Sequence, residues 1–132
     1  MRNLQLRHVA GCAVAVLVLL AGCAGHKQTI DVAAAPGQKV TVDMKASNFK
    51  FDPAVINARV GETLVLNVTN ASGEKHNITV KNPSGKVIAE MDMGAHQTVS
   101  MEISLPTAGV YPFYCDVDAH TTLGMKGRIE VK

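Results

Sequence analysis

Apolar residues recur at every second position along most of this chain of 132 residues. From residue 39 onward, they alternate with polar residues at a period of two, whereas a helix would show a period of 3.6. Successive side chains of a strand point to opposite faces of a sheet, so each apolar set would face a common core. The clearest sets are Val40, Val42 and Met44; Leu64, Leu66 and Val68; Ile78 and Val80; and Val99, Met101 and Ile103.

Turn-forming residues separate these sets at short intervals. They occur at Asp52-Pro53, Val60-Gly61-Glu62, Asn82-Pro83-Ser84-Gly85, Met93-Gly94 and Pro106 to Gly109. Short alternating segments with turns between them are typical of an all-β sandwich or barrel. We expect seven or eight strands, at residues 39–45, 54–58, 63–70, 77–82, 86–91, 97–104, 109–115 and 127–132. The folded domain is therefore predicted to span residues 39–132.

The first 22 residues have the pattern of a signal peptide. Arg2 and Arg7 precede an uncharged run, residues 9–25, which consists mainly of Ala, Val, Leu and Gly. Its strongly apolar part, residues 14–21, is far shorter than the roughly 20 apolar residues that a membrane-spanning helix needs. We therefore predict an exported protein, and a one-pass membrane anchor is the weaker interpretation.

The apolar run ends in Leu20-Ala21-Gly22-Cys23, which resembles the lipobox of bacterial lipoproteins, where the cysteine is acylated after cleavage. The resemblance implies that Cys23 anchors the protein to a membrane, on the periplasmic or cell-surface side. Ala24, rather than Asp, after this cysteine resembles outer-membrane sorting in a Gram-negative cell. Residues 23–38 lack an apolar period and contain Ala, Gly, Pro and Gln, so we expect a lipidated N-terminus with a flexible tether.

The net charge argues against nucleic acid as a partner. The whole chain carries +2, and cleavage before Cys23 would leave 11 basic and 11 acidic residues, which is a neutral protein. A nucleic-acid-binding protein normally has a basic stripe, and none is visible in this sequence. We expect a monomer that does not bind nucleic acid.

One segment near the C-terminus contains three side chains that bind soft metals. Cys115, His120 and Met125 follow one another at intervals of five residues. A thiolate, an imidazole and a thioether together favour copper, and two His and one Cys with a weak axial Met form the blue-copper arrangement. That arrangement requires a second His from another strand. His76, at the start of the segment 77–82, is the candidate.

The cysteines have different predicted fates. Cys12 would leave with the signal peptide and Cys23 would carry lipid, so Cys115 has no partner for an intramolecular disulfide. By itself, Cys115 could be an inert buried residue, an intermolecular link or a metal ligand. Its position beside His120 and Met125 favours the metal ligand.

Five stretches of the chain resemble the cupredoxin family: Asn48 to Pro53, Val60 to Thr63, His76-Asn77, Gly109 to Cys115, and His120 to Gly127. The ligand spacing is similar to that of auracyanin-like and rusticyanin-like members, and the resemblance covers residues 39–132. It implies a Greek-key β-sandwich or barrel that holds one copper ion, as Cu(I) or Cu(II). It also implies that the strong ligands are His76, Cys115 and His120, that the axial ligand is Met125, and that Asn77 orients the thiolate.

Four protein ligands leave no open position for a substrate, so we do not expect an enzyme. The resemblance implies a type 1 copper protein that carries single electrons between redox partners in the cell envelope. The uncharged residues Ala119, Thr121, Thr122 and Leu123 predict transient docking of partners near His120.

Two alternatives remain open. A periplasmic copper-binding or delivery protein could use the same ligands, and Met91, Met93 and His96, which could bind a second copper ion, would favour it. Methionines at alternating positions are more often core or rim residues, however. The other alternative is a cupredoxin-like module without a metal, which is disfavoured because all four ligands are present.

Overall fold

The computed structural model describes residues 28–32, 34–35 and 37–132, which form ten strands and no helix. Three predictions concern residues outside the described part: the signal peptide at residues 1–22, the loss of Cys12 with it, and the lipidation of Cys23. Within the described part, no helix is long and apolar enough to cross a membrane.

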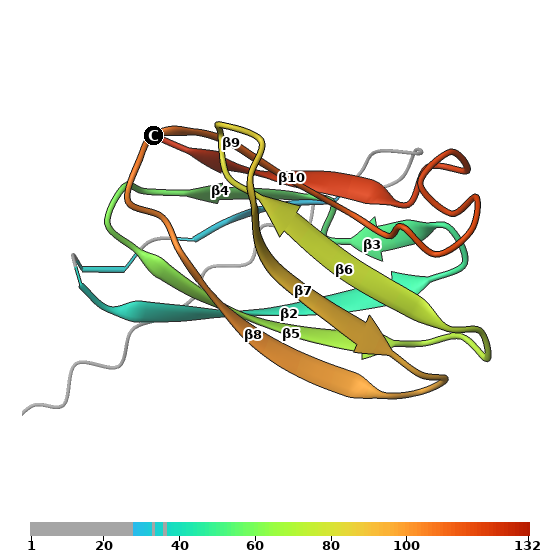
Figure 1. Cartoon of the computed structure of the whole chain (residues 1–132). Helices are drawn as coiled ribbons and strands as arrows, with labels where there is room; N and C mark the ends of the chain where they lie inside the picture. Colours follow the sequence, from blue (N-terminus) through green and yellow to red (C-terminus); the bar gives the residue numbers. More distant parts are fainter. Residues whose placement is uncertain (1–27, 33, 36) are drawn as a thin grey trace, which may run out of the picture.

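The strands form two sheets that lie as two layers (Figure 1). The six-stranded sheet consists, in this order, of β1 (Thr29–Asp31), β4 (Val55–Ala58), β10 (Lys126–Val131), β9 (Gly109–Tyr114), β6 (His76–Lys81) and β7 (Val87–Met93). The four-stranded sheet consists of β3 (Lys50–Asp52), β2 (Lys39–Ser47), β5 (Thr63–Asn70) and β8 (Thr98–Ser104). Strand β4 pairs in parallel with β1 and β10, and β2 pairs in parallel with β5. The predicted all-β fold is confirmed.

The predicted apolar sets form one core between the two sheets. Val40 is half-buried against this core, and the other members of the sets are buried in it: Val42, Met44, Leu64, Leu66, Val68, Ile78, Val80, Val99, Met101 and Ile103. The register of β2 on β5 places Val42 opposite Leu66, so the apolar faces of neighbouring strands coincide. The alternation with period two therefore reports burial correctly in both sheets.

The sequence pattern misses two short strands. Strand β1 lies inside the segment predicted to be a flexible tether, yet it pairs with β4, and the backbone N–H of Val32 donates to the carbonyl of Asn57 at 2.9 Å. At least residues 29–31 therefore belong to the sheet. Strand β3 pairs with the end of β2 after a turn. Each strand has only three residues, which is too short for an alternating pattern to be recognised.

Gly127 lies where β10 begins, directly after the segment that contains the candidate ligands. A Cβ atom at this position would lie 2.4 Å from the carbonyl oxygen of Ala54 and 2.4 Å from the ring of Phe113. Glycine therefore allows β10 to approach its neighbours closely, and this approach fixes the end of the ligand segment.

Candidate metal centre

Three predicted ligands come together at one end of the sandwich. His76 begins β6, Cys115 follows β9, and His120 lies in the loop between β9 and β10. The Nδ1 atoms of the two imidazoles are 3.1 Å apart, and the Sγ atom of Cys115 is 3.5 Å from Nδ1 of His120 and 4.0 Å from Nδ1 of His76. His76 and Cys115 are fully buried, whereas His120 keeps 8% of its surface exposed.

The three atoms leave room for one metal ion between them. A point in their plane lies about 2.1 Å from each atom, which is close to the distances of about 2.0–2.3 Å at which nitrogen and sulfur ligands bind metals. Two imidazoles and one thiolate are the ligand set of a type 1 copper site. Among the described residues, no other group of three or more His, Cys, Asp or Glu side chains lies close enough together to hold a metal ion. The site fits one copper ion.

Ser72 and Asn70 determine which nitrogen of His76 carries the proton. The side-chain oxygen of Asn70 accepts the hydroxyl proton of Ser72 at 2.8 Å and the backbone N–H of Ser72 at 2.9 Å. The amide nitrogen of Asn70 donates to the carbonyls of Glu74 at 2.7 Å and Gly94 at 2.9 Å, which fixes the orientation of the amide.

The hydroxyl of Ser72 has only one proton, so its oxygen must accept a bond from Nε2–H of His76 at 2.8 Å. The lone pair of His76 then lies on Nδ1, the nitrogen that faces Cys115 and His120. The neutral form is also favoured by the protein: burial lowers the pKa of His76, the neighbouring His120 lowers it further, and Glu74 opposes this change. Only the neutral imidazole has a lone pair for a metal.

Asn77 contacts the thiol side of the site. Its backbone N–H donates to Sγ of Cys115 at 3.4 Å. Its side chain forms two bonds with Asp116: the amide donates to the carboxylate, and the amide oxygen accepts the backbone N–H of Asp116 at 2.8 Å. The hydroxyl of Thr79 also donates to this carboxylate at 3.4 Å. Asn77 therefore restrains both the sulfur atom and the residue that follows it.

Backbone hydrogen bonds close the ligand loop. The N–H of Cys115 donates to the carbonyl of Met125 at 3.1 Å, and the N–H of Met125 donates to the carbonyl of His120 at 3.0 Å. The hydroxyl of Thr121 donates to the carbonyl of Cys115. Met125 is fully buried, and its assignment as the axial ligand stays a prediction.

The sequence pattern does not reveal several residues that touch the ligands. Ser72 and Asp116 each bond to a residue of the site, and the ring of Phe49 packs edge-on against His120, with 5.1 Å between the ring centroids. Only sequence proximity could have indicated two of these contacts: Ser72 lies four residues before His76, and Asp116 directly follows Cys115. Phe49 is distant in sequence from every ligand; the family resemblance includes its stretch, Asn48 to Pro53, but does not indicate that it contacts His120.

Met91, Met93 and His96, which could bind a second copper ion, do not form one surface cluster. Met93 is fully buried in the core, whereas Met91 and His96 are exposed. A buried side chain and two exposed ones do not offer their atoms on one accessible surface. Met93 is therefore a core residue and Met91 lies at the rim of the core, as methionines at alternating positions usually do.

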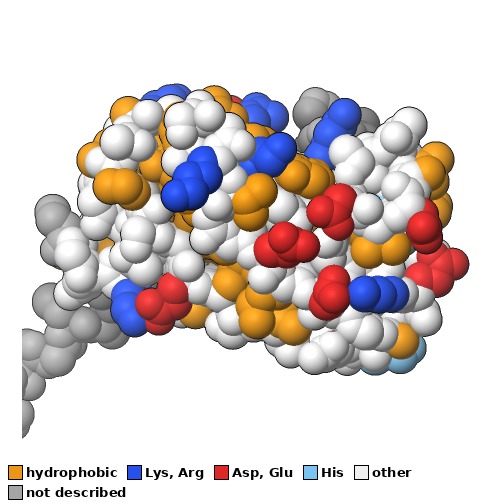
Figure 2. Space-filling view, viewed as in Figure 1, with side chains coloured by type: hydrophobic (Ala, Val, Ile, Leu, Met, Phe, Trp, Pro, Cys, Tyr) orange, Lys and Arg blue, Asp and Glu red, His pale blue; other side chains and the backbone are white. Residues whose placement is uncertain are grey.

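Acidic side chains gather near the candidate site on one face of the molecule. Figure 2 shows this face, formed by β6, β7 and β8, with acidic groups more frequent toward the end where β6 begins. One of them, Asp92, forms an exposed ion pair with Lys75 at 3.1 Å.

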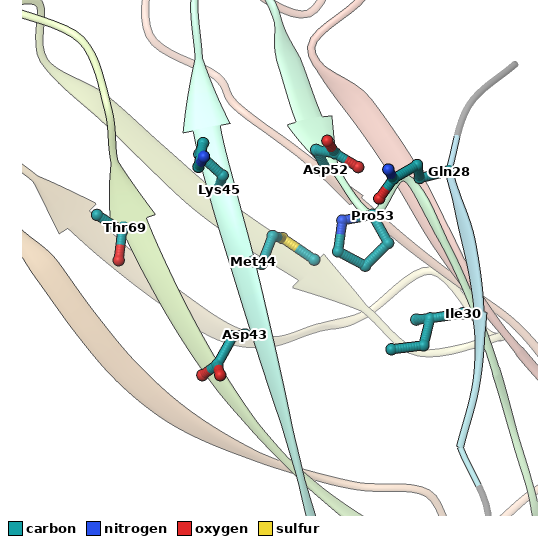
Figure 3. Close-up of a pocket in the computed structure, with 8 residues that line it drawn as sticks. All are labelled: Gln28, Ile30, Asp43, Met44, Lys45, Asp52, Pro53 and Thr69. Carbon is teal, nitrogen blue, oxygen red and sulfur yellow. The ribbon is translucent and has the colours of Figure 1, made fainter. Parts of the chain in front are cut away.

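A separate cavity of about 370 Å³ lies between β1 and β2 (Figure 3). It is lined by Gln28, Ile30, Asp43, Met44, Lys45, Asp52, Pro53 and Thr69. Among the described residues, its Asp52 Oδ1 is the only buried side-chain oxygen or nitrogen without a hydrogen-bond partner. None of the predicted metal ligands lines this cavity, so it is distinct from the candidate metal centre.

Solved structures share the fold of this chain. The reduced auracyanin of Roseiflexus castenholzii is 20% identical, with a TM-score of 0.62 over 70% of this chain and 96% of that one. Auracyanin A of Chloroflexus aurantiacus, a "blue" copper protein, is 24% identical, with a TM-score of 0.62 over 72% of this chain and all of that one. A multi-copper oxidase of Pediococcus acidilactici is 14% identical, with a TM-score of 0.59 over 76% of this chain but only 28% of the oxidase.

These identities are low, so the similarities show the fold alone. No curated protein matches the sequence. The family model of the cupredoxin-like domain matches residues 12–129, which is most of the chain. The chain therefore belongs to the family of proteins with a cupredoxin-like domain.

Proposed function

We propose that this protein is a mononuclear type 1 copper protein that carries single electrons between redox partners in the cell envelope. The observation that carries the proposal is the triangle formed by Nδ1 of His76, Nδ1 of His120 and Sγ of Cys115, which surrounds a point about 2.1 Å from each atom. Copper bound there supplies one-electron exchange between Cu(I) and Cu(II).

The burial of the ligands favours a carrier over an enzyme. His76, Cys115 and Met125 are fully buried, so a substrate has no direct path to the centre through them. The hydrogen bonds around Cys115, Asn77 and His76 hold the site in one geometry, which favours electron exchange with little rearrangement.

His120 offers the route for electrons. It is the one strong ligand that keeps an exposed edge, at 8% of its surface. Leu123, which is 56% exposed, and Thr122 lie in the same loop and carry no charge. A small uncharged surface of this kind suits transient docking of a redox partner.

The electrochemistry of the copper-loaded protein tests the proposal. A carrier should show a reversible one-electron wave and should retain its copper through repeated oxidation and reduction. An irreversible wave with transfer of copper to a competing chelator would contradict the proposal and support copper delivery.

The anchor is proposed from the Leu20-Ala21-Gly22-Cys23 motif, which resembles a lipobox. The protein would be tethered through Cys23 to a membrane on the periplasmic or cell-surface side, and to the outer membrane in a Gram-negative cell. Cells that express the full chain should incorporate radiolabelled palmitate, and the Cys23→Ala variant should not. Equal labelling of both would refute the anchor.

A further inference from the structure

Phe49 has a backbone conformation that its side chain disfavours. It is the second residue of the turn between β2 and β3, and its φ is 65°. Turns with a positive φ at this place usually have Gly or Asn there, because a Cβ atom crowds the neighbouring carbonyl. Asn48, which would tolerate the conformation, stands one residue earlier.

The other two non-glycine residues with positive φ in the described part are His96 and Asp118, at 59° and 46°. Their residue types are enriched in this conformation, whereas a bulky residue such as Phe49 is an outlier. Strained conformations of this kind persist where surrounding contacts hold them, and they cluster at functional sites.

The contacts of Phe49 lead to the metal centre. Its ring meets the imidazole of His120 edge-on, with 5.1 Å between centroids and 65° between planes. The ring is half-buried and packs against the hydrophobic core. A Cβ atom on Gly124, whose φ is 108°, would lie 3.8 Å from the carbonyl oxygen of Phe49, so the ligand loop also passes close to the backbone of the turn. Figure 1 shows the turn and the loop at the same end of the sandwich.

Among the described residues, no hydrogen bond holds Nε2 of His120, whereas Nε2 of His76 is held by Ser72. On its Nδ1 side, His120 contacts His76 and Cys115, and the ring of His76 lies 4.9 Å from its own ring. Because its Nε2 has no such partner, packing must restrain the rest of the ring, and Phe49 is the residue outside the ligand set that packs on it.

We infer that Phe49 is a positioning residue that covers His120 and holds its imidazole in the metal-binding orientation. This inference rests on the proposed copper function. It explains why the turn has Phe where Gly or Asn would fit better: the strained backbone directs the ring onto the ligand. Removal of the ring should loosen the one ligand that lies at the surface.

The test compares Phe49→Ala and Phe49→Gly, which both remove the ring but differ in their tolerance of positive φ. In both variants, copper should pass to excess EDTA at least about tenfold faster than in the unmodified protein, because a ligand has lost its support. Phe49→Gly should nevertheless unfold at a higher denaturant concentration than Phe49→Ala, because glycine adopts positive φ without strain.

Two further variants separate positioning from general stability. Phe49→Tyr keeps the ring and should restore slow copper release. Phe51→Leu removes a buried ring two residues away, which packs on Phe113 at 5.4 Å and not on His120. It should lower the unfolding midpoint and leave the rate of copper release unchanged. If Phe49→Ala and Phe49→Gly both release copper at the unmodified rate, the inference is wrong.

A measurement without copper distinguishes this inference from the proposed function. In NMR spectra of the copper-free protein, the ring protons of His120 should shift when Phe49 is replaced by Leu, because the ring current of Phe49 is lost. The Phe51→Leu control should leave them in place. Unchanged His120 resonances in Phe49→Leu would overturn the inference, whereas failure of the unmodified protein to bind copper would contradict the proposed function alone.

Discussion

Ser72 fixes the tautomer of His76, and this contact leads to the first prediction at the scale of single residues. Ser72→Ala leaves Nε2 without its acceptor, so the proton can move to Nδ1, the nitrogen required by the metal. We expect copper affinity to fall about 10–100-fold, and the free energy of unfolding of the copper-free protein to fall by about 0.5–1.5 kcal/mol. Competition titration and denaturant unfolding measure the two effects.

Ser84→Ala is the matched control, because the hydroxyl of Ser84 also bonds to an asparagine, Asn82, at 2.8 Å but lies on the exposed surface. It should leave copper affinity unchanged. Equal affinities of Ser72→Ala and the unmodified protein would show that the tautomer does not depend on Ser72.

Asp116 follows Cys115 directly, and its carboxylate bonds to Asn77, which also contacts the sulfur atom. Asp116→Asn removes the charge and retains a side chain that can bond to Asn77. Loss of a nearby negative charge disfavours Cu(II), so the reduction potential should rise, by on the order of 40 mV for a Coulomb term of about 1 kcal/mol. Voltammetry measures the change.

Asp118→Asn is the control for this prediction. It removes the same charge two residues away, and Asn also tolerates the positive φ of this position. Its effect on the potential should be smaller than that of Asp116→Asn. A fall in potential in Asp116→Asn would contradict the expected electrostatic effect.

The candidate ligands could be named from the sequence, and Asn77 through the family resemblance, whereas the other residues that contact them could not. Cys115, His120 and Met125 lie within one short segment, and their chemistry is unusual enough to indicate a metal. Ser72 and Phe49 are common residue types whose roles depend on contacts made only in the folded chain.

At the scale of elements, the approach of β10 to β9 determines where the ligand loop ends. Gly127→Ala would place a methyl group 2.4 Å from Phe113 and from the carbonyl of Ala54, so the strands must separate. We expect the free energy of unfolding to fall by about 1–3 kcal/mol, measured with denaturant. Copper affinity should fall as well, because β10 begins directly after the loop.

Gly73→Ala is the control at this scale, because nothing lies within 4 Å of its added Cβ atom and its φ is not in the left-handed range. Its stability should be unchanged or slightly higher. If Gly127→Ala were as stable as Gly73→Ala, close packing at the start of β10 would not constrain the fold.

Strands β5 and β8 could be predicted because in each of them one face is buried and the other is more exposed, so apolar and polar residues alternate along the strand. Strands β1 and β3 could not, since three residues show no period and their pairing with β4 and β2 is fixed by the rest of the sheet. The signal for β1 was further obscured by the Ala, Gly and Pro residues that follow it.

At the scale of the whole molecule, the candidate metal centre lies at one end, and the proposed exit for electrons is the surface near His120, where Leu123 is exposed. Leu123→Lys places a positive charge on this exit, so two copper-loaded molecules should repel each other when these surfaces meet. Electron self-exchange, measured by NMR line broadening, should slow by roughly tenfold at low salt and recover as salt is added.

Val60→Lys is the matched control. Val60 is also exposed, but its backbone bonds to Lys132, beyond the end of β10 that is remote from the ligand loop. It should exchange electrons at a rate closer to that of the unmodified protein. If both variants slow exchange equally, electrons do not leave through the surface near His120.

The absorption spectrum after addition of Cu(II) tests the central claim most directly, with Cys115→Ser and Met125→Leu as comparisons. We expect an intense band in the red part of the visible spectrum from the thiolate of Cys115 bound to copper. The band should be absent in Cys115→Ser and retained in Met125→Leu, with a higher reduction potential in the latter. A correctly folded, reduced protein that shows no such band with Cu(II) would contradict the assignment of a type 1 copper centre.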